Sequence, residues 1–444
     1  MAHESERHLS MPAGAVPQRS IEPYRWFLKS SLLVAITAGW LLGAVELSAI
    51  TFHGVFGPVA ARVINLALFQ VHGQSQIVGW VGLFIMGIAY QVIPRQRRVA
   101  LHTPTLAFVV LGLLLAGIAL RAISQPLAAG SVGFAALLVL SALVELSAVT
   151  LFVAGLVKGR VMAESIQGPE RFSRAGLQWY WLALLLNLAG AVYLAFTRTS
   201  VLPAWIDRPI LDLELFGFVT FMVFGVNARN LPLFMSVKPA PQQLFRRPLW
   251  LLGAGTTLAA AGSALASFEP TAGSAASAAG WLVILAAAVW YAGLVGLLRP
   301  RSRTILPAGR SGWYEAYVLA AYAWLAVGLC LGTAAAALQT AAGAAVADDL
   351  YLAALHAITV GFISTMIMGM AARIVPAFAA RQLHSRGLLI ATWLTITAGT
   401  LLRVPSQALY TLAGGPFVPL LGLSGLLQLA ALVLFGTNLW LTLA

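Results

Sequence analysis

The sequence predicts an all-α membrane protein, a polytopic bundle of twelve transmembrane helices built as three repeats of four. Three observations predict this fold class. Hydrophobic residues make up 60% of the 444 residues and charged residues only 9%, whereas soluble domains carry about 25% charged residues. Twelve apolar runs are long enough to cross a bilayer. Three of these runs share one pattern of glycine and proline.

The apolar runs follow one another through short connections that leave no room for a soluble domain. They cover about 26–50, 64–93, 104–124, 132–157, 176–197, 210–235, 249–268, 279–298, 314–340, 350–375, 387–411 and 417–442. Runs this long and this uniformly apolar favour helices over the alternating strands of a barrel. The first residues are polar and do not resemble a signal peptide. We therefore expect a cytoplasmic tail over 1–25 and a membrane domain over 26–444.

The second, sixth and tenth runs carry the internal repeat. They read VGWVGLFIMGIAYQVIP up to Pro94, FGFVTFMVFGVNARNLP up to Pro232, and VGFISTMIMGMAARIVP up to Pro376. Glycine stands at the same two positions in each: Gly79, Gly217 and Gly361, then Gly87, Gly225 and Gly369. Such glycines allow either close helix approach or a flat group against the backbone. Because the three segments run in one direction, they predict parallel repeats over about 26–157, 176–298 and 314–442, not inverted ones.

The basic residues predict the orientation of the bundle. With the N-terminus in the cytoplasm, nearly all of the 27 Lys and Arg residues fall in inner segments. Five fall outside: Arg62, Arg121, Arg198, Arg208 and Arg403. This positive-inside bias places both termini in the cytoplasm. The same bias accounts for the net charge of +13, because the basic residues lie beside the inner membrane surface. We therefore expect membrane lipid as a partner and no nucleic acid.

Three histidines near the predicted outer face are candidate ligands of a cofactor: His53, His72 and His356. His72 stands 22 residues before Pro94 and His356 stands 20 before Pro376, so the two lie at similar depth. Neutral imidazoles are good axial ligands for haem iron, and two at one level can hold a haem from both sides. The alternative is a pair of histidines that only form hydrogen bonds across helices. Ionisable residues inside a membrane favour a functional role.

The proline alignment does not pair the two histidines directly. Gln74, not His72, matches His356, and the sixth run has Asp212 at that position. An offset of two residues turns a side chain by about 200° on a helix. The histidine pair is therefore a hypothesis that depends on how the helices are placed.

Other polar residues each have two interpretations. Glu46 and Glu145 can move protons or make hydrogen bonds between helices. Arg62, Arg208 and Arg403 can pair with haem propionates or anchor helices at the membrane surface. Met366, Met368 and Met370 can line a copper path or pack. The single cysteine, Cys330, excludes disulfides within the chain, and the sequence has no Cys-x-x-Cys-His for covalent haem.

Three pieces of the sequence resemble the NnrS family of haem- and copper-associated membrane proteins. They are VHGQSQIVGWVGLFIMGIAYQVIP, FGVNARNLPLF and LHAITVGFISTMIMGMAARIVPAF. The resemblance implies a bacterial inner-membrane protein linked to the response to nitric oxide and to denitrification. Members often carry His-x-His at the start of helix 2, where this chain has His72-Gly73-Gln74, so one metal ligand of that motif is absent.

The wider pattern is similar to subunit I of the haem–copper oxidases, which has twelve helices in pseudo-threefold order and haem ligands on helices 2 and 10. This resemblance implies a bis-histidine haem b on His72 and His356, an electron-transfer partner, and a diatomic gas such as nitric oxide as ligand. In those oxidases histidines on helices 6 and 7 hold copper, and helix 10 adds a second histidine. Here the sixth and seventh runs contain no histidine, and Ala354 stands two residues before His356.

Two alternatives remain open on the sequence alone. One is an oxidase-like oxidoreductase subunit, in which His53 completes a copper or other metal site near His72. The other is a transporter without a cofactor, which needs a polar path across the bundle.

Overall fold

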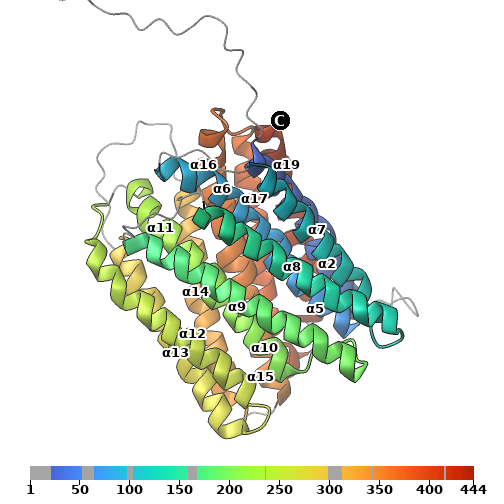
Figure 1. Ribbon diagram of the computed structural model, residues 1–444. Coiled ribbons are helices and arrows are strands. Elements are labelled where there is room, and N and C mark those ends of the chain that lie inside the picture. The colour runs from blue at the N-terminus through green and yellow to red at the C-terminus, as the bar shows by residue number, and fades with distance from the viewer. Residues whose placement is uncertain are drawn as a thin grey trace, which may run out of the picture.

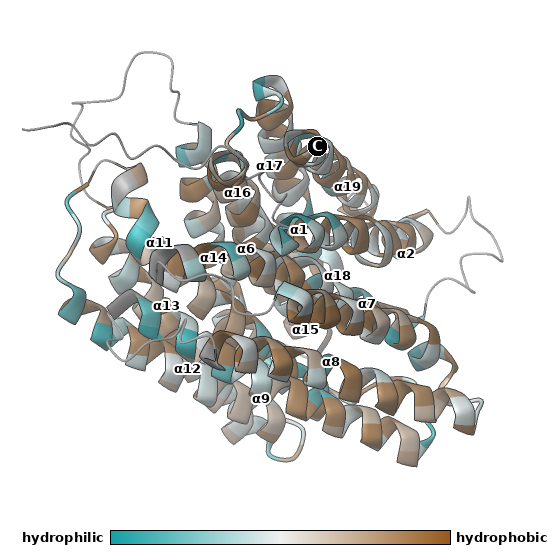
Figure 2. Ribbon diagram, turned by 45° about the horizontal axis from the view of Figure 1, so that its top comes forward, coloured by the Kyte–Doolittle hydropathy of each residue, from teal (hydrophilic) through white to brown (hydrophobic). Residues whose placement is uncertain are grey.

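The computed structural model describes residues 22–52, 65–97, 104–158, 168–235, 237–298, 313–341, 344–414 and 417–444. Within these ranges the chain forms helices and no strands, and twelve helices are long and apolar enough to cross a membrane. The predicted number of spans is therefore confirmed. The helices lie side by side in one bundle (Figure 1), and much of their length consists of hydrophobic residues (Figure 2).

Four of the twelve spans contain a π-helical segment. Span 1 is α1 (Pro23–Val34), η1 (Ala35–Leu41) and α2 (Leu42–Thr51); span 2 is α5 (Leu66–Gln74), η2 (Ser75–Gly82) and α6 (Leu83–Arg97); span 6 is α10 (Ala204–Asp212), η3 (Leu213–Thr220) and α11 (Phe221–Phe234); span 10 is α15 (Ala344–His356), η5 (Ala357–Ser364) and α16 (Thr365–Phe378).

The other eight spans are single helices. They are α7 (Pro104–Leu127), α8 (Val132–Lys158), α9 (Gly168–Thr197), α12 (Arg246–Leu265) with the 3-10 turn η4 (Gln242–Phe245) before it, α13 (Pro270–Leu294), α14 (Trp313–Leu338), α17 (Arg386–Ala408) and α19 (Val418–Leu443). The short helix α18 (Tyr410–Ala413) lies between the last two spans. Span 1 begins at Pro23, inside the segment expected to be a tail.

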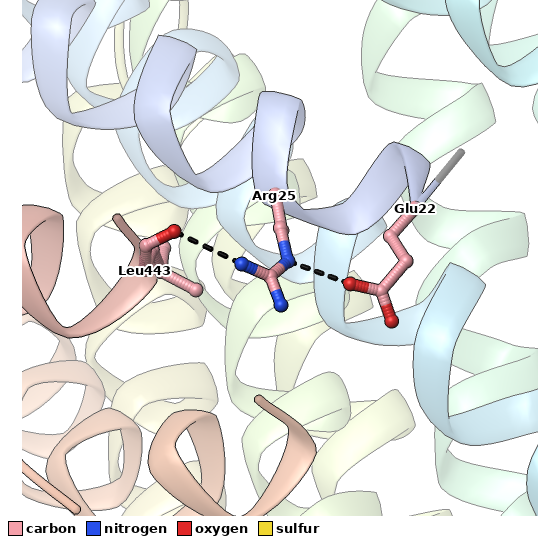
Figure 3. A network of polar contacts seen from close by, with 3 residues as sticks. All are labelled: Glu22, Arg25 and Leu443. Carbon is pink, nitrogen blue, oxygen red and sulfur yellow. Dashed lines mark hydrogen bonds and ion pairs between the residues drawn. The ribbon is translucent and has the colours of Figure 1, made fainter. Parts of the chain in front are cut away.

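The bundle has two ends, which we name by the residues of the repeated spans. The proline end holds Pro94, Pro232 and Pro376, and the histidine end is the opposite one, where α5, α10 and α15 begin. Spans 1 and 12 are joined at the proline end. Arg25 donates a hydrogen bond to the carbonyl of Leu443 at 3.0 Å and pairs with Glu22 at 2.6 Å (Figure 3). The first and last spans therefore meet at the same end of the bundle.

Three of the π segments occupy the same place in their repeats. Each of η2, η3 and η5 begins 19 residues before its proline and ends 12 residues before it. A π turn joins residues five apart instead of four. Hydroxyl side chains follow this spacing, since Thr220 donates to the carbonyl of Leu215 at 2.8 Å and Thr365 to that of Val360 at 3.0 Å. The common register confirms the threefold repeat.

The glycine in the middle of each π segment allows close helix packing. In every repeat, a Cβ on this glycine would lie under 3.0 Å from a side chain on the first helix of the same repeat. The pairs are Gly79 with Val34 at 2.4 Å, Gly217 with Trp179 at 2.9 Å, and Gly361 with Trp324 at 2.6 Å. The three partners are equally spaced along the chain. Of the two roles considered for these glycines, the structure therefore shows helix contact.

Candidate functional site

His72 lies on α5, just before the π segment η2. Its Nδ1 atom is 2.9 Å from the carbonyl oxygen of Gly39 in span 1. Because a carbonyl only accepts hydrogen bonds, Nδ1 carries the proton and Nε2 keeps its lone pair. Gly43 gives the ring its room, since a Cβ there would lie 2.5 Å from the imidazole. The ring is thus held against span 1 through Nδ1, and the lone pair of Nε2 is not used in this contact.

His356 is the last residue of α15 and is bonded in the same tautomer. Its Nδ1 atom donates to the carbonyl of Leu352, one turn earlier, at 2.8 Å. Its Nε2 atom accepts a hydrogen bond from Nη2 of Arg403 at 3.2 Å. A guanidinium only donates, so Nε2 of His356 has the lone pair that a metal would use.

Both predicted histidines lie at the histidine end, within electrostatic range of Arg403 and of each other. Of the two, His356 is in direct contact with Arg403. Their spans are also joined nearer the middle of the bundle, where Trp80 donates to the hydroxyl of Ser364 at 3.2 Å. Gln74 does match His356 in position, because each directly precedes its π segment, but Gln74 has a different partner. The two-residue offset therefore does not separate the histidines.

Arg403 is buried, with 8% of its surface exposed. Its Nε and Nη1 atoms have no hydrogen-bond partner within the described part of the chain. A buried guanidinium with free donors favours an anionic group, and carboxylates are the best match to its geometry. The surface-anchor interpretation therefore does not hold for Arg403.

Of the remaining candidates for the predicted site, those that the structure describes have other partners or pack in the core. Arg208 pairs with Asp348 at 2.6 Å and lies over the ring of Tyr351. His53 and Arg62 lie outside the described residues. Met366, Met368 and Met370 are buried in the core, which agrees with a packing role. Among the residues described, no group of three or more His, Cys, Asp and Glu is arranged to hold a metal ion.

The residues at the histidine end fit a haem. Metal-bound histidines usually donate their other N–H to a carbonyl or carboxylate, and both His72 and His356 do so here. The free donors of Arg403 fit the carboxylates that a haem carries. His72, His356 and Arg403 are thus the residues that would hold it.

Nearly the whole chain matches one known protein family. The family model described as NnrS protein matches residues 21–444. The chain belongs to the NnrS family.

The fold of this NnrS-family chain is similar to that of a known oxidase. A cryo-EM structure of a haem–copper terminal oxidase dimer matches it with a TM-score of 0.68 at 11% sequence identity, covering 95% of this chain and 84% of that chain. At this identity the match shows the fold alone, which is the predicted oxidase subunit I-like architecture. A search of curated proteins finds no match to this chain.

The NnrS-family chain also has a buried polar network that the sequence analysis missed. Gln74 donates to Glu145 on α8 at 2.9 Å, and Asn187 on α9 donates to Gln74 at 2.9 Å. Arg121 on α7 donates to Asn187, and also to Gln125 at 2.9 Å. Every one of these residues is buried. The interhelical interpretation of Glu145 is confirmed. Arg121 is buried inside the bundle, in the last part of α7 towards the histidine end.

Arg121 of this network and Arg403 of the histidine site occupy equivalent positions in the first and third repeats. A Cβ on Gly117 would lie 2.6 Å from Glu145, and one on Gly399 would lie 2.8 Å from Gln428. Arginine follows each of these glycines by four residues, as Arg121 and as Arg403. This shared Gly-x-x-x-Arg spacing is the signal that could have revealed the network.

Proposed function

We propose that this chain is a haem-binding protein of the bacterial inner membrane, with a bis-histidine haem b on His72 and His356. One observation carries the proposal. Two histidines on symmetry-related spans interact electrostatically, donate Nδ1–H to backbone carbonyls, and keep Nε2 for a metal beside a buried arginine with free donors.

The chain's own residues define how the site works. The carbonyls of Gly39 and Leu352 keep the Nδ1 atoms protonated, so each Nε2 atom presents its lone pair. Arg403 has to leave Nε2 of His356 before a metal binds there, and its donors then turn to an acidic group. When bound, a haem supplies one-electron transfer and, if one histidine leaves, binding of a diatomic gas.

The physiological setting follows from the family and from the charge distribution. The family link to nitric oxide and denitrification makes nitric oxide the candidate gas and implies an electron-transfer partner. The positive-inside rule places the proline end and both termini in the cytoplasm. The haem then lies near the periplasmic surface.

Optical spectra test the haem assignment directly. The protein is purified in detergent, and reduced-minus-oxidised spectra are recorded for wild type, His72→Ala, His356→Ala and the control His384→Ala. We expect a b-type spectrum that is lost or becomes high-spin in the first two variants. His384 is exposed at the proline end, so its variant should keep the wild-type spectrum. A colourless wild type at normal expression contradicts the proposal.

Metal analysis separates this function from the oxidoreductase alternative. Haem alone at stoichiometric amount supports electron transfer or gas binding at the histidine pair. Copper at the same stoichiometry as haem favours an oxidase-like reaction, with His53 as a ligand near His72. The variant His53→Ala should then lose copper and keep haem.

A further inference from the structure

Two carboxylates of the first and second repeats lie buried with unused oxygens. Glu145 on α8 is 0% exposed and Glu214 in η3 is 1% exposed. One oxygen of each, Oε1, has no hydrogen-bond partner in the described structure. The hydroxyl of Tyr180 on α9 is equally buried and has no partner there. The ring of Tyr180 stacks on Phe218, four residues after Glu214 in η3, and each carboxylate lies within electrostatic range of this tyrosine, so the three groups form one cluster.

The charges of this cluster do not balance. Arg121 acts on Glu145, Glu214 and Asp207, so one guanidinium faces three carboxylates. Arg208 also acts on Asp207, but it is paired with Asp348. An uncompensated carboxylate in an apolar interior costs several kcal/mol. A positive charge must therefore enter the cluster.

A proton suits the available atoms better than a metal ion. The unpartnered oxygens are those of two carboxylates and one phenol, whereas a hard cation such as Ca²⁺ takes six or more oxygen ligands. One proton on a carboxylate removes a negative charge and supplies a donor for a neighbouring oxygen. Gln74 holds the carboxylate of Glu145 in place and is itself held by Asn187, which accepts a hydrogen bond from Arg121. These amide and guanidinium groups do not change their protonation state near neutral pH.

Asp207 connects the cluster to the histidine end. It is half-buried in the first turn of α10, at the histidine end, and it acts electrostatically on Glu214. We propose that Glu145 and Glu214 form a proton-binding site inside the bundle, which exchanges with water at the histidine end through Asp207. In the binding step a carboxylate takes up one proton to become a carboxylic acid, and no electron moves. The site does not require a haem.

Infrared difference spectroscopy of the purified protein tests this proposal. A pH titration in detergent follows the carbonyl stretch of buried carboxylic acids in wild type, Glu145→Gln, Glu214→Gln and the control Glu46→Gln. Glutamine has the shape of a protonated glutamate, so we expect these variants to fold. Glu145→Gln should remove one band and change the titration midpoint of the Glu214 band. Glu214→Gln should likewise remove the Glu214 band and change the midpoint of the Glu145 band. Glu46 is buried in span 1, and its variant should leave both bands and midpoints unchanged.

A second variant tests the route of exchange. Asp207→Asn should slow hydrogen–deuterium exchange of the Glu145 and Glu214 bands several-fold and leave their amplitudes unchanged. The proposal is overturned if no acid band of these two residues appears over the pH range in which the protein stays folded. It is also overturned if sodium at constant pH removes the bands, since the cluster would then hold a metal ion. Equal exchange rates in Asp207→Asn and wild type would overturn the route.

Discussion

Arg403 donates its hydrogen bond to the Nε2 atom of His356, 3.2 Å away, and this is the atom that a metal would need. The two interactions exclude each other, because Nε2 has a single lone pair. The arginine therefore keeps the histidine neutral and oriented until another group takes its place. Arg403 then stays beside the site as a buried positive charge.

This charge predicts the redox behaviour of the proposed haem. Replacing Arg403 by Gln should lower the midpoint potential, because a nearby positive charge disfavours the oxidised, more positive haem. Arg403→Lys should keep most of the wild-type potential. A redox titration followed by absorbance measures both. Arg208→Gln serves as the control, and an equal shift in that variant would contradict a specific role for Arg403.

Close helix contact predicts that the repeated glycines tolerate no side chain. Gly361→Ala places a Cβ 2.6 Å from Trp324, so we expect a loss of about 1–3 kcal/mol in the free energy of unfolding. Gly112→Ala on α7 is the matched control, because a Cβ there meets no atom within 4 Å. Thermal unfolding in detergent compares the two. Equal stability of both variants would show that the packing at Gly361 can adjust.

Gln74 and His72 are neighbours in sequence with separate tasks. Gln74→Leu should leave the carboxylate of Glu145 and the Nδ2 donor of Asn187 without their buried partner, at a cost of about 1–3 kcal/mol. It should not change the haem spectrum, because Gln74 bonds residues of α8 and α9. His72→Ala should do the opposite and remove the spectrum. Loss of haem from Gln74→Leu in a folded protein would place Gln74 in the haem site.

The ion pair between Arg208 and Asp348 should contribute little to stability. The side chains are 27% and 50% exposed, so water screens their attraction. A double-mutant cycle with Arg208→Gln and Asp348→Asn should give a coupling energy of about 0.2–1 kcal/mol, which falls as salt is raised. A coupling several times larger would mean that lipid or neighbouring protein excludes water from the pair.

The sequence was sufficient for the features that repeat at fixed spacing. Hydropathy located the twelve spans, and the glycine–proline pattern located the three repeats. The depth of His72 and His356 suggested a pair, but only the placement of the helices could show that an offset of two residues is tolerated. Trp179 and Trp324 share a residue type but Val34 does not, so the equal spacing of these three contacts gives a match in only two of the three repeats.

Other features depend on local geometry that residue types do not encode. The π segments contain no residue pattern that distinguishes them from α-helix, since they differ by one residue in the hydrogen-bond spacing. The charge distribution placed Arg121 on the outer side of the membrane but did not show that its side chain is buried. Its bonds to Asn187 and Gln125 show this.

The matched π segments limit how the chain can change in length. Each π turn takes up one residue more than an α-helical turn between the same flanking helices. Removing one residue from η2 would therefore let that turn wind as ordinary α-helix and leave the helices on either side in their present relative orientation. Removing one residue from α6 instead would rotate His72 by about 100° relative to Pro94 and move it away from Gly39. The matched positions of η2, η3 and η5 thus mark where these spans can lose a residue at the lowest cost.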